Sequence, residues 1–195
     1  MGKLGSQILQ EKNKSNRRWK NFEKTSLDTS NRKAKKIFKK IKKIGLSTRD
    51  LYSLLSGSNN FLGVFSADQI PLIIDSTRPI FLIVNIDNSE LPGSHWIAFR
   101  LSLSSLEVFD SLGFCPQRWK KFPKSILNFL LRYNQSHKIF GTPRLQEENS
   151  YTCGAYCIYF VLFRQLRSFN QCLNIFSTDY SENDFLVLDK IKKLK

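Results

Sequence analysis

Four side chains between positions 95 and 153 have the types needed to hydrolyse a peptide bond: His95, Asp110, Gln146 and Cys153. The cysteine would attack as a thiolate, which is favoured at a helix N-terminus because unpaired N–H groups gather there. Cys153 is followed by glycine and then by an apolar run typical of a helix. A core cysteine that opens a buried helix would look the same. A catalytic role therefore depends on a base and an orienting acid elsewhere in the chain.

Two neighbouring strands are expected to supply the base and the acid. Residues 95–102 alternate in polarity, residues 106–110 form a second short strand, and only three residues separate them. Such a short connection predicts an antiparallel hairpin, with His95 and Asp110 at its open end. Asp110 could then hold one ring nitrogen while the other faces Cys153. Taken singly, the histidine could bond to a loop carbonyl and the aspartate could belong to a turn; their joint placement favours a triad.

Gln146 completes the candidate site. It stands seven residues before Cys153, where its amide could donate to the oxyanion of a tetrahedral intermediate alongside the cysteine backbone N–H. Such a donor contributes about 3 kcal/mol, although a loop glutamine is commonly just solvated. Gly154 would leave room for a substrate backbone, and we expect Trp96 and Gly154 to contact substrate. Cys157, one helical turn after Cys153, is predicted to be a core residue.

The composition and the apolar pattern predict a globular, soluble, intracellular protein. The 195 residues are 41% hydrophobic with 16 Phe, enough for a core. The sequence shows no apolar run long enough to cross a bilayer and no secretory signal, so disulfides are not expected. Its two histidines lie far apart and none of the cysteine spacings is Cys-x-x-Cys, so no metal site is expected.

Basic residues concentrate in the first 46 positions, with 15 Lys/Arg against 3 Asp/Glu, whereas residues 47–195 carry 16 against 13. We therefore predict a basic N-terminal extension, 1–46, and a protease domain, 47–195. Residues 31–44 have the pattern of a basic amphipathic helix, which could lie on a membrane, contact nucleic-acid phosphates or dock on the domain. Gly2 and Ser6 match the N-myristoylation pattern, or match it by chance.

The remaining pattern predicts an α+β fold. We expect a central strand at 79–85, buried on both faces, because it is a continuous apolar run. The other expected elements are a helix that begins at a capping box, Ser47–Asp50, a loop over 61–71, a helix over 124–133 with Ile126, Leu127, Leu130 and Leu131 inward, a strand over 138–143, and helices over 153–169 and 184–195.

These residues resemble the adenovirus protease family, adenain, which also has homologues in adenovirus-related viruses and Maverick/Polinton-type transposons. The resemblance rests on His95-Trp96, on Val108–Phe114 with Asp110, on Gln146, and on Cys153-Gly154, and covers roughly residues 47–160. It implies a papain-like, adenain-like fold: a mixed, mainly antiparallel sheet between helices, with the nucleophile at a helix N-terminus. Cys153 would be the nucleophile, His95 the base, Asp110 the orienting acid and Gln146 the oxyanion donor.

By the same resemblance, the substrates would be capsid and virion precursor proteins cleaved during maturation, in the virion and the host nucleus or cytoplasm. Small residues, especially glycine, are expected near the scissile bond, with a hydrophobic residue further upstream. The chemistry requires no cofactor, but activation by DNA is expected from the family. Adenain is also activated by a peptide disulfide-linked to a cysteine between its acid and its nucleophile. Here that interval holds only Cys115, five residues after Asp110, which argues against a peptide cofactor.

Two other functions stay open on the sequence. A protease that removes SUMO-like or ubiquitin-like modifiers would use the same chemistry, and the aspartate in place of the adenain glutamate is typical of those enzymes. The seven-residue spacing between Gln146 and Cys153 and the compact domain favour adenain. A non-catalytic protein that binds DNA or a membrane on the same fold is the other alternative. It is disfavoured because all four candidate positions hold chemically competent residues.

Overall fold

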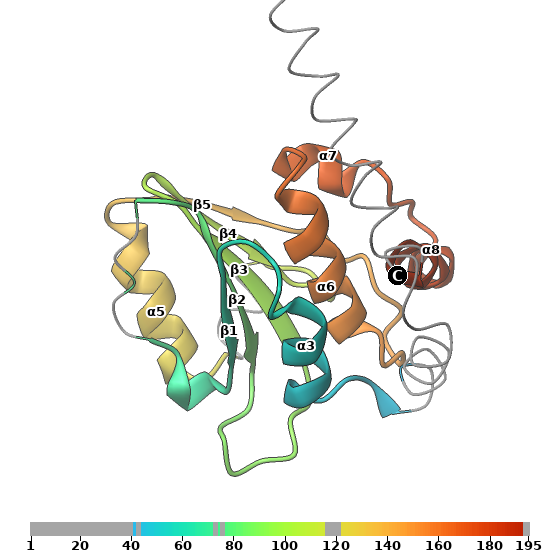
Figure 1. The fold of residues 1–195 in the computed structure, drawn as a ribbon, viewed down its shortest axis with the longest axis horizontal. Helices are drawn as coiled ribbons and strands as arrows, with labels where there is room; N and C mark the ends of the chain where they lie inside the picture. The colour runs from blue at the N-terminus through green and yellow to red at the C-terminus, as the bar shows by residue number, and fades with distance from the viewer. Residues whose placement is uncertain (1–40, 42–43, 72–73, 75–76, 116–121, 193–195) are drawn as a thin grey trace, which may run out of the picture.

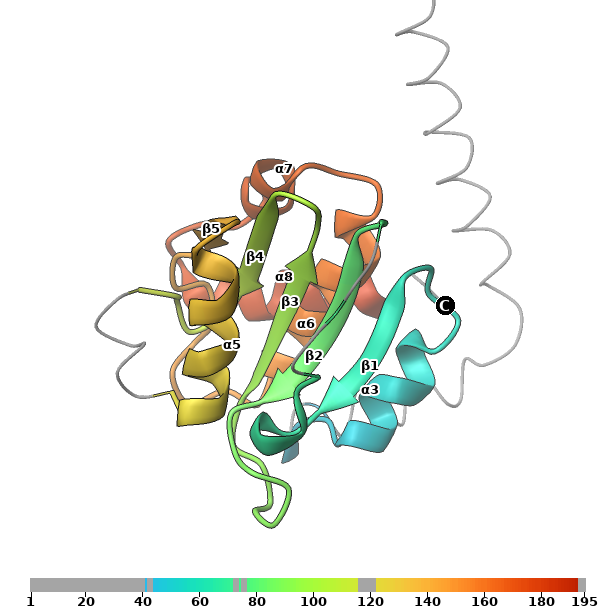
Figure 2. The same ribbon diagram turned by 90° about the vertical axis from the view of Figure 1, so that its left-hand side faces the viewer.

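Residues 41, 44–71, 74, 77–115 and 122–192 are described by the structure, a computed structural model. A five-stranded sheet in the order β1-β2-β3-β4-β5 forms its centre, and helices cover both faces (Figures 1 and 2). The strands are β1 Phe61–Phe65, β2 Ile80–Asn85, β3 Trp96–Leu101, β4 Ser105–Phe109 and β5 Lys138–Gly141. The predicted α+β fold with a mixed sheet is confirmed, although two of the four strand pairings, β1 with β2 and β4 with β5, are parallel.

The predicted hairpin is confirmed. β3 and β4 pair antiparallel, with Ala98 opposite Phe109 and Leu101 opposite Leu106. β2, the predicted central strand, is almost entirely buried because apolar side chains project from both of its faces into the core. Phe81 and Ile83 point into one core, and Leu82 and Val84 into the other.

Helices α3 Thr48–Leu55, α6 Cys153–Arg164, α7 Phe169–Leu173 and α8 Tyr180–Lys192 lie on one side of the sheet, and α5 Lys124–Asn134 lies on the other (Figure 1). A 3-10 turn, η1 Ala67–Gln69, packs with α5. α6 crosses β3 and contacts α3 and α8 on its other flanks, so it is buried on nearly every face. This explains why its sequence is apolar without a polar stripe.

The start of α3 shows how the basic extension joins the domain. Ser47 and Asp50 form the predicted capping box, with Asp50 N–H donating to the serine hydroxyl and Ser47 N–H to the carboxylate. Just before it, Leu46 is buried, and Ile41 is fully buried in the same core. The domain boundary at residue 46 stays a prediction. Most of the predicted basic helix and Gly2 lie outside the described residues and stay predictions too.

Four local predictions were wrong. Residues 61–65 form strand β1 instead of a loop; Gly63, with a register shift beside it, weakens the apolar pattern there. The helix from Cys153 ends at Arg164, because Ser168 and Gln171 form a capping box that starts α7. α8 begins at Tyr180, four residues earlier than expected. Leu131 is 58% exposed, while Phe129 and Tyr133 fill the core positions of α5 instead.

In the part of the chain that the structure describes, none of the helices has the length and apolar character needed to span a membrane.

Candidate active site

The open end of the β3–β4 hairpin brings His95 and Asp110 together. Nε2 of His95 lies 2.7 Å from Oδ1 of Asp110, and both side chains are buried. The same carboxylate oxygen accepts a hydrogen bond from the backbone N–H of Leu112 at 2.9 Å. Gly113, whose positive φ of 93° suits glycine, then turns the chain against the backbone of Arg144. Asp110 is thus fixed from both its own turn and the neighbouring strand.

Cys153 is the thiol whose interaction with the imidazole of His95 contributes to the raised pKa of that ring. It is the first residue of α6 and is partly exposed. Because Nε2 of the ring faces Asp110, Nδ1 is the nitrogen left for the thiol. Burial disfavours the charged ring, but the hydrogen bonds and negative charge of Asp110 and Cys153 outweigh it and raise the pKa of His95 to about 9. The arrangement therefore favours an imidazolium at neutral pH.

Gln146 is buried in the loop before α6, and its amide orientation is defined by its partners. Oε1 accepts a hydrogen bond from the Ser111 hydroxyl at 2.6 Å. Nε2 lies 2.9 Å from the carbonyl oxygen of Ser150 and 3.0 Å from its hydroxyl oxygen. The amide nitrogen is thereby directed toward the turn that leads into Cys153.

Trp96 and Gly154 have clear packing roles beside the site. The indole N–H of Trp96 donates to the carbonyl oxygen of Leu46 at 2.9 Å, which ties β3 to the segment before α3. A Cβ on Gly154 would lie 3.1 Å from Leu46 and 3.4 Å from Leu51. Glycine at this position therefore leaves room for two core leucines, and the substrate contact expected of Gly154 stays a prediction.

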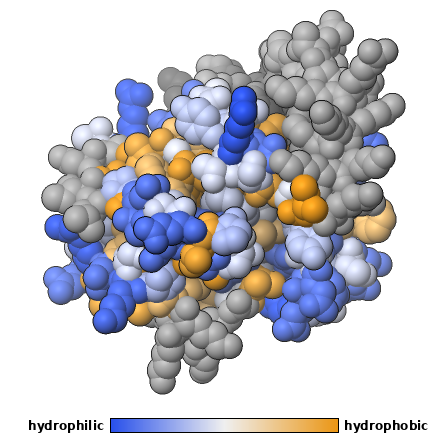
Figure 3. All heavy atoms as spheres, turned by 90° about the horizontal axis from the view of Figure 1, so that it is seen from below, coloured by the Kyte–Doolittle hydropathy of each residue, from blue (hydrophilic) through white to orange (hydrophobic). Residues whose placement is uncertain are grey.

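A groove of about 430 Å³ lies between the start of α3 and the β2–β3 loop, and Trp96, the neighbour of His95 in sequence, lines it. Leu46, Val64 and Asn85 line it as well. Two strongly exposed apolar side chains, Ile44 and Leu91, stand at its walls. Viewed onto this end of the molecule, the surface shows apolar residues in separate groups among hydrophilic ones (Figure 3). The groove is therefore suited to an extended peptide with an apolar side chain.

Sequence reasoning missed Asp184. This aspartate of α8 is 8% exposed, and its Oδ1 lies 2.9 Å from the Thr152 hydroxyl and 3.0 Å from the Tyr156 hydroxyl. In sequence it looks like an ordinary acidic residue near the start of an amphipathic helix. A signal was present nonetheless, because Asn183-Asp184 puts two polar residues where the apolar face of that helix continues.

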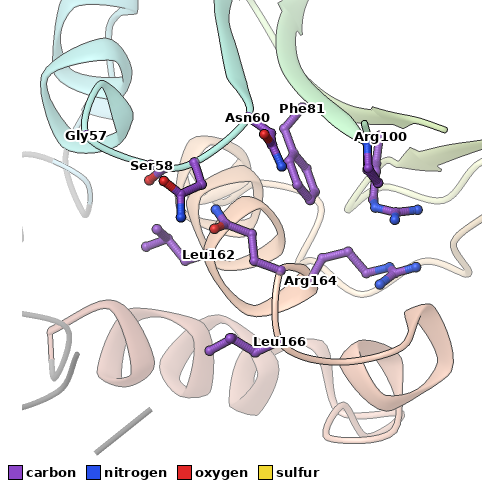
Figure 4. A pocket seen from close by; sticks show the side chains of 11 residues that line it. Gly57, Ser58, Asn60, Phe81, Arg100, Leu162, Arg164 and Leu166 are labelled. Atoms are coloured by element: carbon purple, nitrogen blue, oxygen red, sulfur yellow. The ribbon is translucent and has the colours of Figure 1, made fainter. Parts of the chain in front are cut away.

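A second cavity, of about 330 Å³, lies at the opposite end of α6 from Cys153 (Figure 4). Arg100 and Arg164 reach its edge, and both bind the buried carboxylate of Glu107, at 2.9 Å and 2.7 Å. Phe81 and Leu162 supply apolar walls. Both arginines are thus held by a structural ion pair away from the candidate active site.

Cys157 and Cys172 differ from Cys153 because they are buried. Cys157 is buried, as predicted, and burial raises its pKa well above the ordinary value. Burial likewise raises the pKa of Cys172 to about 11. Cys115 is partly exposed, and all four thiols are free. Among the described residues no group of three or more His, Cys, Asp or Glu side chains is arranged to hold a metal ion.

Comparison with known proteins identifies one matching family. The model of the adenovirus endoprotease matches residues 61–180. A search of the curated proteins found no significant match.

Among solved structures, an ASFV protease is 22% identical, with a TM-score of 0.42; the match covers 60% of this chain and 43% of that one, so this chain matches less than half of its length. The SUMO protease Ulp1 is 14% identical over 82% of this chain and 81% of that one, with a TM-score of 0.45. ChlaDub1 from Chlamydia trachomatis is 18% identical, with coverage of 60% and 58% and a TM-score of 0.42.

Proposed function

Because the chain belongs to the adenovirus endoprotease family of cysteine peptidases, we propose that it is an endopeptidase that cleaves viral or transposon capsid and virion precursors during maturation. The observation that carries the proposal is the 2.7 Å contact of His95 with Asp110, together with the interaction of Cys153 with the same ring. A base held by an acid on one nitrogen and facing a thiol on the other is the arrangement that nucleophilic catalysis needs.

In the proposed mechanism, the Cys153 thiolate attacks the scissile carbonyl carbon, forming a C–S bond and placing negative charge on the carbonyl oxygen. The backbone N–H of Cys153 stabilises that oxyanion, and the amide of Gln146 joins it by turning one N–H from Ser150 to the oxyanion. The His95 imidazolium then gives its proton to the leaving amine as the C–N bond breaks, which leaves a thioester. His95 next takes a proton from water, the resulting hydroxide attacks the thioester, and the acid product leaves as the thiol is regenerated.

Asp110 keeps the ring in place through both steps. Its carboxylate accepts from Nε2, which leaves Nδ1 to exchange the proton with the thiol, the leaving amine and water. Its second oxygen, Oδ2, is buried and has no hydrogen-bond partner among the described residues. A buried carboxylate with one oxygen lacking a hydrogen-bond partner favours a charged imidazole beside it.

The groove lined by Trp96 supports a substrate with an apolar residue upstream of the scissile bond. Ile44 and Leu91 offer apolar surface there, and Trp96 forms part of the wall. Small residues such as glycine at the bond itself would let the substrate backbone approach the buried His95. This agrees with the substrate class that the family suggests.

We also propose that residues 1–46 bind nucleic acid, which would bring the protease to precursors assembled on DNA. Their 15 basic against 3 acidic residues support this. A salt titration of DNA binding should be steep for the full chain and lose that steepness when residues 1–46 are removed. Retention of the same slope would contradict the proposal. A membrane surface is the alternative target if Gly2 is acylated, and mass spectrometry of protein made in eukaryotic cells would detect the acyl group.

Two sets of substrates test the proposed specificity. The full chain, with and without DNA, is incubated with capsid precursor polypeptides and with SUMO or ubiquitin fusions. Cleavage of the precursors at sites with small residues at the bond is the expected result, with little action on the fusions. Activity on the fusions alone would replace the proposal with a modifier protease, and activity on neither would favour a non-catalytic protein.

A further inference from the structure

The residue before the nucleophile does not do what its position suggests. Thr152 is the N-cap residue of α6, where a threonine hydroxyl commonly accepts a hydrogen bond from the N–H groups of the first turn. Here it makes no such bond. Its hydroxyl instead donates to Asp184 on α8, 2.9 Å away. The N–H groups at the start of α6 are therefore not occupied by the cap, and a different helix holds the Thr152 side chain.

The Thr152 hydroxyl belongs to a series of hydrogen bonds in which every donor points the same way. Thr152 gives its only proton to Asp184, so it must accept from the Ser150 hydroxyl, 2.8 Å away. Ser150 in turn accepts from Nε2 of Gln146. At the other end, Ser111 donates to Oε1 of Gln146. Every donor points toward the Asp184 carboxylate, and bonds aligned in this way reinforce one another in a buried setting.

α8 also binds the residue just before Gln146, Leu145. The Asn183 amide donates to the Leu145 carbonyl at 3.0 Å and to Ser177 at 2.9 Å. The Tyr156 hydroxyl lies 3.0 Å from both Leu145 O and Asp184 Oδ1. Burial raises the pKa of the Asp184 carboxyl, although the hydrogen bonds that it accepts, those from Thr152 and Tyr156 among them, act in the opposite direction. Two adjacent residues of α8 thus hold both ends of the loop that carries Gln146 and Cys153.

We propose that Asp184 is a positioning residue for oxyanion stabilisation: through Thr152 and Ser150 it sets the Cys153 backbone N–H and the Gln146 amide. The inference rests on the proposed peptidase function. The hydrogen bonds of Asp184 go to Thr152 and Tyr156 and not to the thiol or the imidazole. Asp184 should therefore affect the tetrahedral intermediate and not thiolate formation. That separates it from His95 and Asp110.

The test compares peptide hydrolysis with alkylation of Cys153 by iodoacetamide, a reaction that needs the thiolate but no oxyanion donors. Thr152→Val keeps the shape of the side chain and removes the donor, whereas Thr152→Ser keeps the donor. In Thr152→Val and Asp184→Asn, kcat should fall about 10- to 100-fold with KM nearly unchanged, because small misplacement of catalytic groups has effects of this size. The alkylation rate should stay within about twofold of the unmodified chain.

Thr152→Ser should restore the turnover lost in Thr152→Val, which a general loss of stability would not explain. If Asp184→Asn does not fold, the comparison of Thr152→Val with Thr152→Ser tests the inference without it. Glu182→Gln, which removes an exposed carboxylate from the same helix, is the control and should leave turnover unchanged. Unchanged kcat in Thr152→Val, or an equal fall in hydrolysis and alkylation, would overturn the inference while leaving the peptidase in place. An unmodified chain that alkylates but cleaves no peptide would overturn the proposed function and this inference with it.

Discussion

His95 and Asp110 face each other at 2.7 Å across the open end of the β3–β4 hairpin, and neither side chain has much access to solvent. Replacing Asp110 by Asn keeps the shape but removes the charge that favours an imidazolium. The alkaline limb of the pH profile of kcat/KM, expected near pH 9 from the His95 pKa, should move to lower pH, and kcat should fall at least about tenfold. A profile unchanged in shape and height would contradict the role of Asp110.

The same contact makes folding stability depend on pH. The pKa of His95 is raised from 6.5 to about 9 in the folded chain, so the folded state binds a proton more tightly than the unfolded state. The extra stability, on the order of 3 kcal/mol, is complete below pH 6.5 and is lost as the pH rises through about 9. Urea unfolding of the unmodified chain and of His95→Gln should show a stability difference that shrinks between pH 6.5 and 9.5. A constant difference would mean that the charge of His95 contributes nothing to folding.

The hairpin could be predicted because its signals are local. Alternating polarity and a connection of three residues determine which strands pair, and pairing alone puts His95 and Asp110 at one end. The start of α6 could be predicted for a similar reason, since a long apolar run begins at Cys153. β1 could not, because five residues interrupted by Gly63 lack a clear period and gain their place only by pairing with β2.

Asp184 could not be predicted because its partners come from tertiary packing. It is separated from Thr152 by 32 positions, and α8 meets α6 only after α7 has turned the chain back. The break between α6 and α7 was also hidden, since Leu166 and Phe169 continue the apolar spacing of α6 although the capping box at Ser168 begins a new helix. The candidate triad is thus readable from local patterns, whereas the network that supports it is not.

Gly154 offers a test of packing beneath the site. Alanine is the better helix former by about 1 kcal/mol, but its Cβ would sit 3.1 Å from Leu46. Overpacking of a dense core costs about 1–3 kcal/mol, so Gly154→Ala should lower the free energy of unfolding in urea. Gly57→Ala is the matched control, because nothing lies within 4 Å of the new methyl group. Greater stability of Gly154→Ala would mean that Leu46 moves aside freely.

Glu107 is a test of the ion pair at the far end of the sheet. Glu107→Gln would leave the largely buried guanidinium groups of Arg100 and Arg164 without their counter-charge. Breaking a buried pair in this way costs about 3–5 kcal/mol, measured by urea unfolding. Turnover of the folded fraction should be unchanged, because the pair lies away from His95. Glu148→Gln, which breaks a largely exposed pair with Arg144, should have little effect on stability. Equal effects of the two substitutions would contradict a structural role for Glu107.

The most direct test of the whole account is peptide cleavage by Cys153→Ala. The thiol is the only group proposed to form a covalent bond with substrate, so the variant should fold normally and cleave nothing above background. Cys115→Ala, which removes another partly exposed thiol, should cleave like the unmodified chain. If cleavage by Cys153→Ala is undiminished, Cys153 is not the nucleophile and the proposed mechanism is wrong.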